Sequence, residues 1–299
     1  MSSKLKVRNC RPQNPRDAAA YEQLKEGAVF AHLLSHPYYQ ADKNLFFAEL
    51  DGVIVGYINV LPELDIGRVV LDYGVSLSHS LESVLRELMK CALKRAKELG
   101  AGVAHMSVPS DETAQAKVLA RLGFKQVRRF DEMRLDISEV GLEAADQSDW
   151  SRRYLEAGEE EVLANIQNRC FTGTWGYNPN TVEHIAWQRK VKSNCPEDVI
   201  LAMDKGEVIG YCWTVAERGR GSSRGKKKGR IYMLGVDTDY RSRDIGRKLL
   251  RAGLLHLKNK GREIIDITVD SQNVVAVKLY RSLGFKSREQ TIWYEKIIG

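Results

Sequence analysis

The sequence predicts an α/β (α+β) protein made of two tandem copies of one domain, each a mixed, mostly antiparallel sheet flanked by helices. Short motifs recur at one long spacing, and in each half hairpin-forming strands precede strands that alternate with helices. The chain has 299 residues, of which 43% are hydrophobic and 28% charged, and these are ordinary values for globular proteins. That length is sufficient for two domains with separate cores.

The repeat is visible as pairs of identical motifs. Leu122-Gly123-Phe124-Lys125 recurs as Leu283-Gly284-Phe285-Lys286, a spacing of 161 residues (283 − 122). Gly74-Val75 recurs as Gly235-Val236 at the same spacing. Two copies of one domain explain these pairs with the fewest assumptions.

An insertion distinguishes the second copy. Gly56-Tyr57 recurs as Gly210-Tyr211 at a spacing of only 154 residues (210 − 56). The second copy therefore carries seven extra residues (161 − 154) between Gly210-Tyr211 and Gly235-Val236. We expect a first domain over residues 1–140, a boundary near Ser138–Gln147, and a second domain over residues 146–299.

The elements of the first copy follow from apolar alternation and turn residues. A hairpin is expected across Asp51-Gly52, and the amphipathic helix before Gly100 ends at a glycine. The expected elements are strand Lys4–Asn9, helix Arg16–Glu26, strands Leu45–Glu49, Val53–Leu61 and Arg68–Val75, helix Leu81–Glu98, strand Gly102–Val108, helix Glu112–Leu122 and the closing strand Phe124–Asp136.

The second copy has the same order, with a hairpin across Lys205-Gly206. Its expected elements are helices Val162–Arg169 and Thr181–Val191, strands Val199–Met203, Val208–Val215 and Ile231–Val236, helix Gly246–Lys260, strand Ile264–Val269, helix Asn273–Leu283 and the closing strand Lys286–Lys296.

The positive charge of the chain is concentrated in one segment. The net charge is +7, and Glu217–Arg230 holds seven basic residues and one acid, so the rest of the chain contributes +1 (7 − 6). This segment is either a solvated loop or an anion-binding loop for an acceptor or partner. Nucleic-acid-binding proteins more often spread basic residues over a face with interleaved aromatic residues, so nucleic acid is not the expected partner.

The cysteines and the hydropathy favour a cytoplasmic protein. The five cysteines are odd in number and include no Cys-x-x-Cys pair, which favours reduced thiols over disulfides or a metal site. The first residues, MSSKLKVRN, lack the apolar stretch of a secretory signal, and no apolar run is long enough to span a bilayer. We therefore expect neither a bound metal nor a membrane partner.

Two motifs of the second copy resemble those of a known family. Val236–Leu250 resembles the central motif of the GNAT acetyltransferases, in which a strand leads through Arg/Gln-x-x-Gly-x-Gly/Ala into a helix. Asn273–Phe285 resembles their second motif. The tandem layout with an active carboxyl-terminal copy is similar to that of the mycothiol synthases. The resemblance covers nearly the whole chain and implies acetyl-CoA as the co-substrate.

The resemblance also implies a cradle for the pyrophosphate of acetyl-CoA. Free N–H groups and the dipole at a helix N-terminus attract phosphate, and arginines add charge. We expect the cradle to comprise Arg241, Ser242, Arg243, Asp244, Ile245, Gly246 and Arg247. Asp244 stands where the family has its first glycine, so binding requires that its carboxylate caps the helix or turns to solvent.

The pantetheine arm is expected to pair, like a short strand, with Leu234, Gly235 and Val236, as the resemblance implies. Gly235 either marks a bulge that directs N–H groups toward the thioester carbonyl or is a glycine required by close packing.

Four side chains complete the expected site. Tyr280 lies on an apolar helical stripe, where a core tyrosine is the default, but the resemblance makes it the general acid that protonates the leaving thiolate. Asn273 is expected to bond the pantetheine arm, to cap its helix, or both. Trp175 and Tyr177 lie where the family binds acceptors, and a purely structural aromatic loop is the alternative.

The general base is not apparent from the sequence. An amine acceptor must lose a proton before it attacks. Mycothiol synthase-like enzymes carry a glutamate at the start of the central strand, and the matching residue here is Arg230, which cannot accept a proton. Glu295, Tyr232 and a water chain remain as candidates.

The first copy lacks the residues that define the second. With the repeats aligned, its cradle is Ser80–Leu85, without glycine or arginine, and Leu119 and Glu112 replace Tyr280 and Asn273. We expect this copy to keep the fold and not to bind the coenzyme.

The sequence therefore predicts an N-acetyltransferase that moves acetyl from acetyl-CoA directly to an amine of a small molecule or peptide. A non-catalytic CoA-binding or interaction protein on the same fold is the first alternative. A nucleic-acid-associated protein that uses Arg218–Arg230 is the second.

Overall fold

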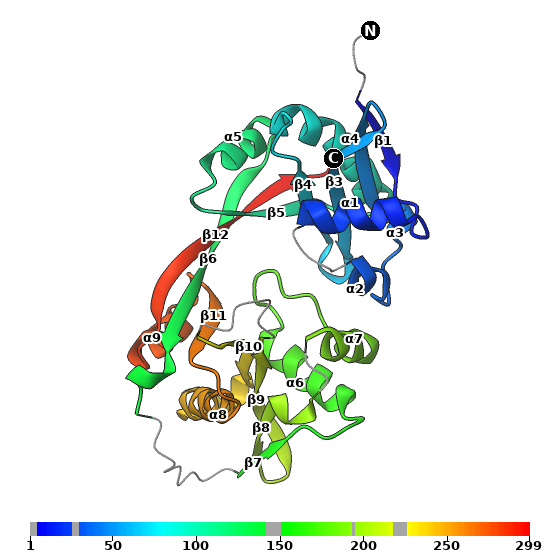
Figure 1. Cartoon of the computed structure of the whole chain (residues 1–299). Coiled ribbons are helices and arrows are strands. Elements are labelled where there is room, and N and C mark those ends of the chain that lie inside the picture. The colour runs from blue at the N-terminus through cyan, green and yellow to red at the C-terminus, as the bar shows by residue number, and fades with distance from the viewer. Residues whose placement is uncertain (1–4, 26–29, 142–150, 193–194, 218–225) are drawn as a thin grey trace. The chain divides into compact units, whose positions relative to one another are not determined.

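A computed structural model describes residues 5–25, 30–141, 151–192, 195–217 and 226–299 (Figure 1). The chain folds into two compact units, which are Met1–Arg128 with Thr291–Gly299 (unit 1) and Arg129–Gln290 (unit 2). Most of the expected boundary near Ser138–Gln147 lies outside the described residues. Within the described ranges, no helix has the length and apolar character needed to cross a membrane.

Unit 1 is built on a sheet with the strand order β1-β2-β3-β4-β5-β12. Neighbouring strands are antiparallel except β4 and β5, which are parallel. The strands are β1 (Lys6–Asn9), β2 (Leu45–Leu50), β3 (Val53–Glu63), β4 (Arg68–Val75), β5 (Val103–Pro109) and β12 (Lys286–Ile297). The helices are α1 (Pro15–Lys25), α2 (Phe30–Leu34), α3 (Ala41–Asn44), the 3-10 turn η1 (Leu64–Ile66), α4 (Leu81–Glu98) and α5 (Thr113–Arg121).

Unit 2 repeats this plan with the strand order β6-β11-β10-β9-β8-β7, in which β10 and β11 are the parallel pair. The strands are β6 (Lys125–Asp136), β7 (Ser151–Tyr154), β8 (Val199–Asp204), β9 (Glu207–Ala216), β10 (Lys228–Val236) and β11 (Ile264–Asp270). The helices are α6 (Glu160–Phe171), α7 (Val182–Lys192), α8 (Ile245–Asn259) and α9 (Val274–Ser282), with 3-10 turns η2 (Ile137–Glu139), η3 (Pro196–Asp198) and η4 (Thr238–Tyr240).

Helices cover both faces of each sheet. In unit 2, α8 and α9 pack on one face, and α6 and α7 pack on the other (Figure 1). Alternate residues of β9 enter these two cores, since Cys212 joins the first and Trp213 the second. In unit 1, α4 and α5 cover one face, and α1 and α2 the other. The predicted α/β class with mostly antiparallel sheets is confirmed.

The two closing strands are exchanged relative to the expected pairing. The strand predicted to close the first copy, β6, pairs with β11 of unit 2, and β12 pairs with β5 of unit 1. Met133 and Leu135 of β6 are buried in the core of unit 2, whereas Tyr294 of β12 is buried in the core of unit 1. Because both strands follow the same Leu-Gly-Phe-Lys motif, the sequence pattern does not distinguish their partners.

Apart from the 3-10 turns, three short elements were not predicted, namely α2, α3 and β7. Their four or five residues are too few to show a helical or strand period, and only their packing identifies them.

Candidate active site

The strands β10 and β11 diverge partway along β10. Their parallel pairing covers Lys228–Ile231 of β10, whereas the pairing with β9 continues to Val236. From Tyr232 onward, the edge of β10 that faces β11 has no strand partner in the described pairings. The unpaired N–H and C=O groups of such an edge can bind an extended chain as an added strand. Leu234, which is expected to contact pantetheine, lies on this edge together with the next two residues.

Gly235 is a packing glycine, and the expected bulge lies elsewhere. The register of β10 with β9 shifts around Tyr232 and is regular at Gly235. A Cβ atom on Gly235 would lie 2.9 Å from Cβ of Cys170 and 2.9 Å from a ring carbon of Tyr211. Gly235 therefore allows α6 to approach β10 closely, and the bulge occurs where β10 and β11 begin to part.

The segment between β10 and α8 forms a concave turn. Ser242 and Asp244 have φ values of 64° and 59°, and α8 begins at Ile245. Such an alternation of left-handed and ordinary residues directs successive N–H groups to one side and makes an anion-binding nest. The first helical hydrogen bond runs from the N–H of Lys248 to the carbonyl of Asp244, at 3.2 Å. The first three N–H groups of α8 therefore have no acceptor within the described residues.

Gly246 is the second residue of α8 and lies beside this turn. A Cβ atom there would lie 3.7 Å from side-chain carbons of Leu279 and Val236, which is ordinary van der Waals contact, so packing does not require glycine at this position. Ile245, in contrast, is only 3% exposed and belongs to the core.

The arginines of the turn have different partners. Arg241 donates to the carbonyl of Cys170 at 2.8 Å and to that of Val236 at 3.3 Å, so it holds the turn against α6 and β10. Arg243 is exposed, with its guanidinium 5.0 Å from the centre of the Tyr240 ring. Arg243 is therefore better placed than Arg241 to meet a solvent-borne phosphate.

Asp244 does not cap α8. Its side chain makes no capping hydrogen bond and is 57% exposed, and its carboxylate accepts a hydrogen bond from Arg247 at 3.2 Å. Of the two arrangements considered from the sequence, the carboxylate adopts the solvent-facing one. Its positive φ explains why a glycine suits this position, since aspartate is among the few other residues that tolerate this conformation.

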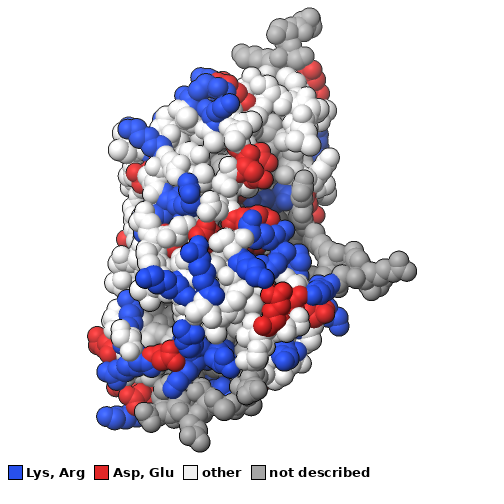
Figure 2. All heavy atoms as spheres, turned by 90° about the vertical axis from the view of Figure 1, so that its left-hand side faces the viewer, with Lys and Arg blue, Asp and Glu red and all other residues white. Residues whose placement is uncertain are grey.

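A positive surface surrounds the turn. The segment from Arg241 to Lys260 holds seven basic residues and one acid, a net charge of +6 (7 − 1). Figure 2 shows Lys and Arg side chains gathered over the lower part of the face that carries α8 and α9. This charge attracts polyanions to the start of α8.

Tyr280 and Asn273 lie on α9, beside the divergence of the strands. Tyr280 is 6% exposed and belongs to the core, and its hydroxyl makes no hydrogen bond within the described residues. Burial raises the pKa of Tyr280 above its ordinary value, so the phenol keeps its proton at neutral pH. The side-chain oxygen of Asn273 caps α9 by accepting from the N–H of Ala276 at 3.1 Å, which leaves its NH₂ group available.

Trp175 and Tyr177 occupy different environments in the turn after α6. The Trp175 ring lies 6.0 Å from that of Phe130 on β6. The Tyr177 ring stacks on Phe171 at 5.4 Å, and its hydroxyl donates to Asn168 at 2.8 Å. Burial raises the pKa of Tyr177 to about 12. These contacts hold Tyr177 in the loop, and both Trp175 and Tyr177 are partly exposed.

The candidate bases from the sequence are poorly placed to accept a proton. Glu295 belongs to unit 1, where it bonds His105 at 2.8 Å. Tyr232 packs edge-on against Trp213, and burial raises the pKa of Tyr232. Arg230 lies 3.8 Å from Glu132 and 3.5 Å from Glu217. Glu132 lies on β6, a strand that the sequence predicts to close the first domain.

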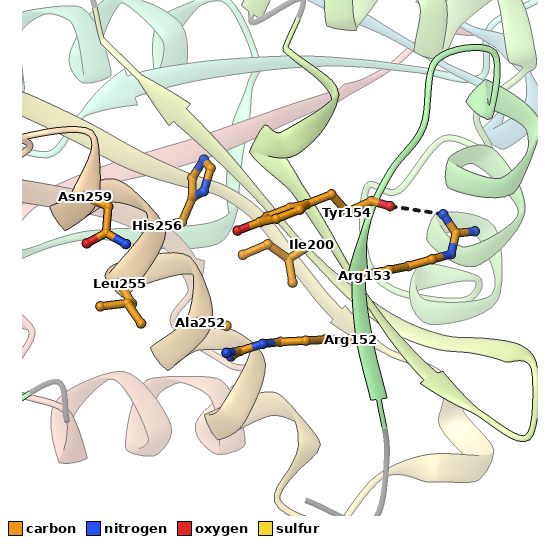
Figure 3. Close-up of a pocket in the computed structure, with 8 residues that line it drawn as sticks. All are labelled: Arg152, Arg153, Tyr154, Ile200, Ala252, Leu255, His256 and Asn259. Carbon is orange, nitrogen blue, oxygen red and sulfur yellow. Dashed lines mark hydrogen bonds between the residues drawn. The ribbon is translucent and has the colours of Figure 1, made fainter. Parts of the chain in front are cut away.

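A pocket of about 170 Å³ lies elsewhere in unit 2, between β7, β8 and the carboxyl-terminal half of α8 (Figure 3). None of the expected cradle residues lines it. Its lining residues are Arg152, Arg153, Tyr154, Ile200, Ala252, Leu255, His256 and Asn259. The Tyr154 and His256 rings lie 5.7 Å apart, and Arg153 donates to the Tyr154 carbonyl. In the part of the chain that the structure describes, no group of His, Cys, Asp and Glu side chains could hold a metal ion.

Both halves of the chain match the model of the acetyltransferase (GNAT) family, over residues 11–124 and 161–285. The chain therefore belongs to this family, and the predicted tandem repeat and the predicted acyltransferase activity are confirmed.

Among its relatives, the mycothiol acetyltransferase of Actinosynnema mirum is 26% identical over 285 residues, which are 94% of this chain and 89% of that protein. The mycothiol acetyltransferase of Thermobifida fusca is 38% identical over 142 residues, 46% of this chain and 44% of that protein.

Solved structures share the fold over nearly the whole chain. A tandem GNAT protein from the clavulanic acid biosynthesis pathway matches with a TM-score of 0.74 and 13% identity, over 99% of each chain. A GCN5-related N-acetyltransferase from Sphaerobacter thermophilus matches with a TM-score of 0.71 and 18% identity, over 98% of this chain and 96% of that one.

Proposed function

We propose that unit 2 transfers acetyl from acetyl-CoA to an amine of a small molecule or peptide. The observation that carries this proposal is that the open edge of β10 leads directly into the nest at the start of α8. Coenzyme A has the matching chemistry, since an extended amide-bearing arm ends in a pyrophosphate. The arm would pair with Leu234–Val236, and the pyrophosphate would meet the free N–H groups of Ile245, Gly246 and Arg247.

The arm runs from the nest back along β10, because the nest comes after the end of that strand. Its thioester would then lie toward the divergence of β10 and β11. The unpaired N–H groups of β10 there can stabilise the oxyanion that forms when the amine attacks. Tyr280, which keeps its proton at neutral pH, would protonate the departing thiolate.

Direct transfer is favoured over a covalent acetyl-enzyme. Cys170 packs against β10, but burial raises its pKa to about 12, as it does for Cys212 on β9. The thiolate is the nucleophilic form of cysteine, so these buried thiols are unreactive at neutral pH. The amine itself is therefore the nucleophile in this proposal.

The relatives support a small amine as the acceptor, since several are named mycothiol acetyltransferase. The partly exposed Trp175 is proposed to contact the acceptor, with Tyr177 holding the loop.

The proposal is tested by thiol release from acetyl-CoA in the presence of glucosamine, L-cysteinamide, spermidine or a short peptide with a free amino terminus. We expect at least one amine to gain one acetyl group by mass spectrometry. Binding of acetyl-CoA without thiol release for any amine would instead favour a non-catalytic CoA-binding protein.

A variant pair connects this activity with the nest. Gly246→Val places a branched side chain at the open turn and should raise the KM for acetyl-CoA by about tenfold or more. Gly141→Ala is the matched control, because a Cβ atom there meets nothing within 4 Å. Equal KM values for both variants would show that the nest is not part of the coenzyme site.

A further inference from the structure

A polar cluster lies where β10 and β11 part. Arg230 of β10 donates to the hydroxyl of Thr268 at 3.0 Å. Thr268 follows Ile267, the last residue of β11 that pairs with β10. The same arginine lies 3.8 Å from the carboxylate of Glu132 on β6, and Glu132 is the cross-strand partner of Thr268. A carboxylate is thus brought next to the divergence, toward which the thioester would point.

Strand alternation directs Glu132 to the face opposite α8 and α9. Its neighbours Met133 and Leu135 are buried in the core beneath these helices, so Glu132 points to the other face. Phe130 shares the face of Glu132 and contacts the ring of Trp175. The carboxylate and the proposed acceptor loop therefore lie on the same side of the sheet.

The carboxylate of Glu132 is open to a ligand. It accepts no hydrogen bond within the described residues, its side chain is 27% exposed, and its basic neighbours Arg230 and Arg288 both lie at 3.8 Å. Asp266, on the same face, is fully engaged by comparison, since it accepts hydrogen bonds of 2.6 and 2.7 Å from Arg134.

We propose that Glu132 is the general base of the acetyl transfer and accepts a proton from the ammonium group of the acceptor. This inference rests on the proposed function and assigns the base that the sequence leaves open. Arg230 cannot take this role, because a guanidinium stays protonated in proteins. The base is thus supplied by β6, which lies two strands from β10 in the sheet.

The protons balance over the whole reaction. The ammonium gives one proton to Glu132, and the nitrogen lone pair then forms the bond to the carbonyl carbon of the thioester. The carbon–sulfur bond breaks, the thiolate takes a proton from Tyr280, and the nitrogen gives up a second proton that restores the phenol. Glu132 releases its proton to solvent. An ammonium and acetyl-CoA thereby yield the amide, free coenzyme A and one proton.

The test is the pH dependence of kcat/KM for the best amine of the panel, in wild type and Glu132→Gln. We expect a loss of about 100-fold at pH 7, within the usual range for a general base. The loss should shrink as the pH rises toward about 9.5, because more of the amine is then already neutral in solution. The charged groups around Glu132 are Arg230 on β10 and Arg288 on β12, and Glu217 in turn faces Arg230. Both arginines stay protonated between pH 7 and about 9.5, so they do not contribute to the pH dependence.

Two further variants keep the outcome clear. Glu139→Gln removes an exposed carboxylate of the same unit, paired with Lys286, and should leave kcat/KM unchanged. Glu132→Asp keeps a carboxylate and should recover part of the activity. The affinity of Glu132→Gln for acetyl-CoA should stay within twofold of wild type, which also shows that the variant folds.

The outcomes separate the two proposals. Wild-type kcat/KM in Glu132→Gln, a loss that is equal at every pH, or a parallel loss of acetyl-CoA affinity would each overturn the assignment of Glu132. An absence of turnover with every amine in the wild-type protein would overturn the proposed function itself.

Discussion

The two units share the divergence of their parallel strands and differ in the segment after it. In unit 1, β4 pairs with β5 only over Arg68–Val70, although β4 continues to Val75. In unit 2, β10 pairs with β11 only over Lys228–Ile231. An opening between strands is therefore a property of the fold and does not by itself make a coenzyme site.

The helices after the two openings begin at different positions in the aligned repeats. Leu81, the first residue of α4, corresponds to position 242 (81 + 161), so α4 begins three residues before the equivalent of Ile245. Helix in unit 1 thus occupies the positions that form the nest in unit 2. The Ser80 hydroxyl caps α4 by accepting from the N–H of Ser83, and the acid Glu82 lies in its first turn.

Unit 1 also fills its opening with side chains. Tyr73 of β4 donates to Gln115 of α5 at 2.6 Å, and these residues correspond to Leu234 and Ala276 of unit 2. A capped helix, an acid and two larger side chains thus stand in unit 1 where unit 2 has the nest and the open strand edge, while the sheet is kept.

The largest difference expected between the units is the number of coenzyme sites. Calorimetry should find one acetyl-CoA per chain, because among the described residues the nest lies in unit 2 alone. Gly246→Val should weaken that site, whereas Leu85→Val at the equivalent position of unit 1 should leave it unchanged. Two comparable sites in the wild-type chain would show that the comparison is wrong.

The next largest effect is expected at Tyr280. Tyr280→Phe should lower kcat by about 10- to 1,000-fold and leave acetyl-CoA affinity nearly unchanged, because in the proposed mechanism the hydroxyl acts on a thiolate that does not yet exist when the coenzyme binds. Tyr73→Phe in unit 1 is the matched control and should keep wild-type kcat. Wild-type turnover in Tyr280→Phe would leave Tyr280 with a packing role alone.

The pH profile offers a second check on Tyr280. Burial raises its pKa above the ordinary value, so the acid form persists to higher pH than that of a solvent-exposed tyrosine. Activity should therefore show no alkaline decline from this group up to about pH 10, the ordinary pKa of tyrosine. A decline below that pH that disappears in Tyr280→Phe would contradict this assignment.

A smaller effect, a gain in acetyl-CoA affinity, is expected from substitutions at Asp244. Asp244→Gly removes an exposed carboxylate beside the nest, frees Arg247 and suits the positive φ, so acetyl-CoA affinity should rise by about threefold, as for an exposed charge pair. Asp244→Asn separates the two causes, since it removes the charge and keeps a side chain. Equal or weaker affinity in both variants would mean that the carboxylate does not repel the phosphates.

The smallest effect is expected from the basic segment that leads into β10. Replacing Lys226, Lys227 and Lys228 by serine should change acetyl-CoA affinity by less than about threefold. The eight steps from Lys228 to Val236 span about 26 Å at 3.3 Å each, which is about three Debye lengths at physiological salt. A large loss of affinity would contradict this separation. Arg224 of the same basic segment lies outside the described residues.

Local patterns in the sequence were sufficient to predict the turns and helices around the site. The hairpin residues Asp51 and Lys205 both adopt the positive φ values that their turns require. The motif that begins at Val236 located the start of α8 to within one residue, since Ile245 rather than Gly246 begins the helix.

Pairings between distant segments could not be read from such patterns. β6 and β12 are each 12 residues long and follow the same motif, so either strand could close either sheet. The candidate base Glu132 becomes visible only after this choice is made. The packing role of Gly235 likewise depends on Cys170 and Tyr211, which lie far from it in the sequence, so the residues next to Gly235 could not indicate it.

The exchange of closing strands has a consequence for how the protein is made. In unit 1, Ser107 pairs with Trp293, a separation of 186 residues (293 − 107). A ribosome that has completed β1 to β5 has therefore not yet synthesised the strand that covers the edge of β5. That edge stays open while all of unit 2 is translated, and an open strand edge pairs readily with other chains. Unit 2 already holds its own closing strand, β6, when its last helix emerges. During synthesis the second half of the protein can therefore finish folding before the first.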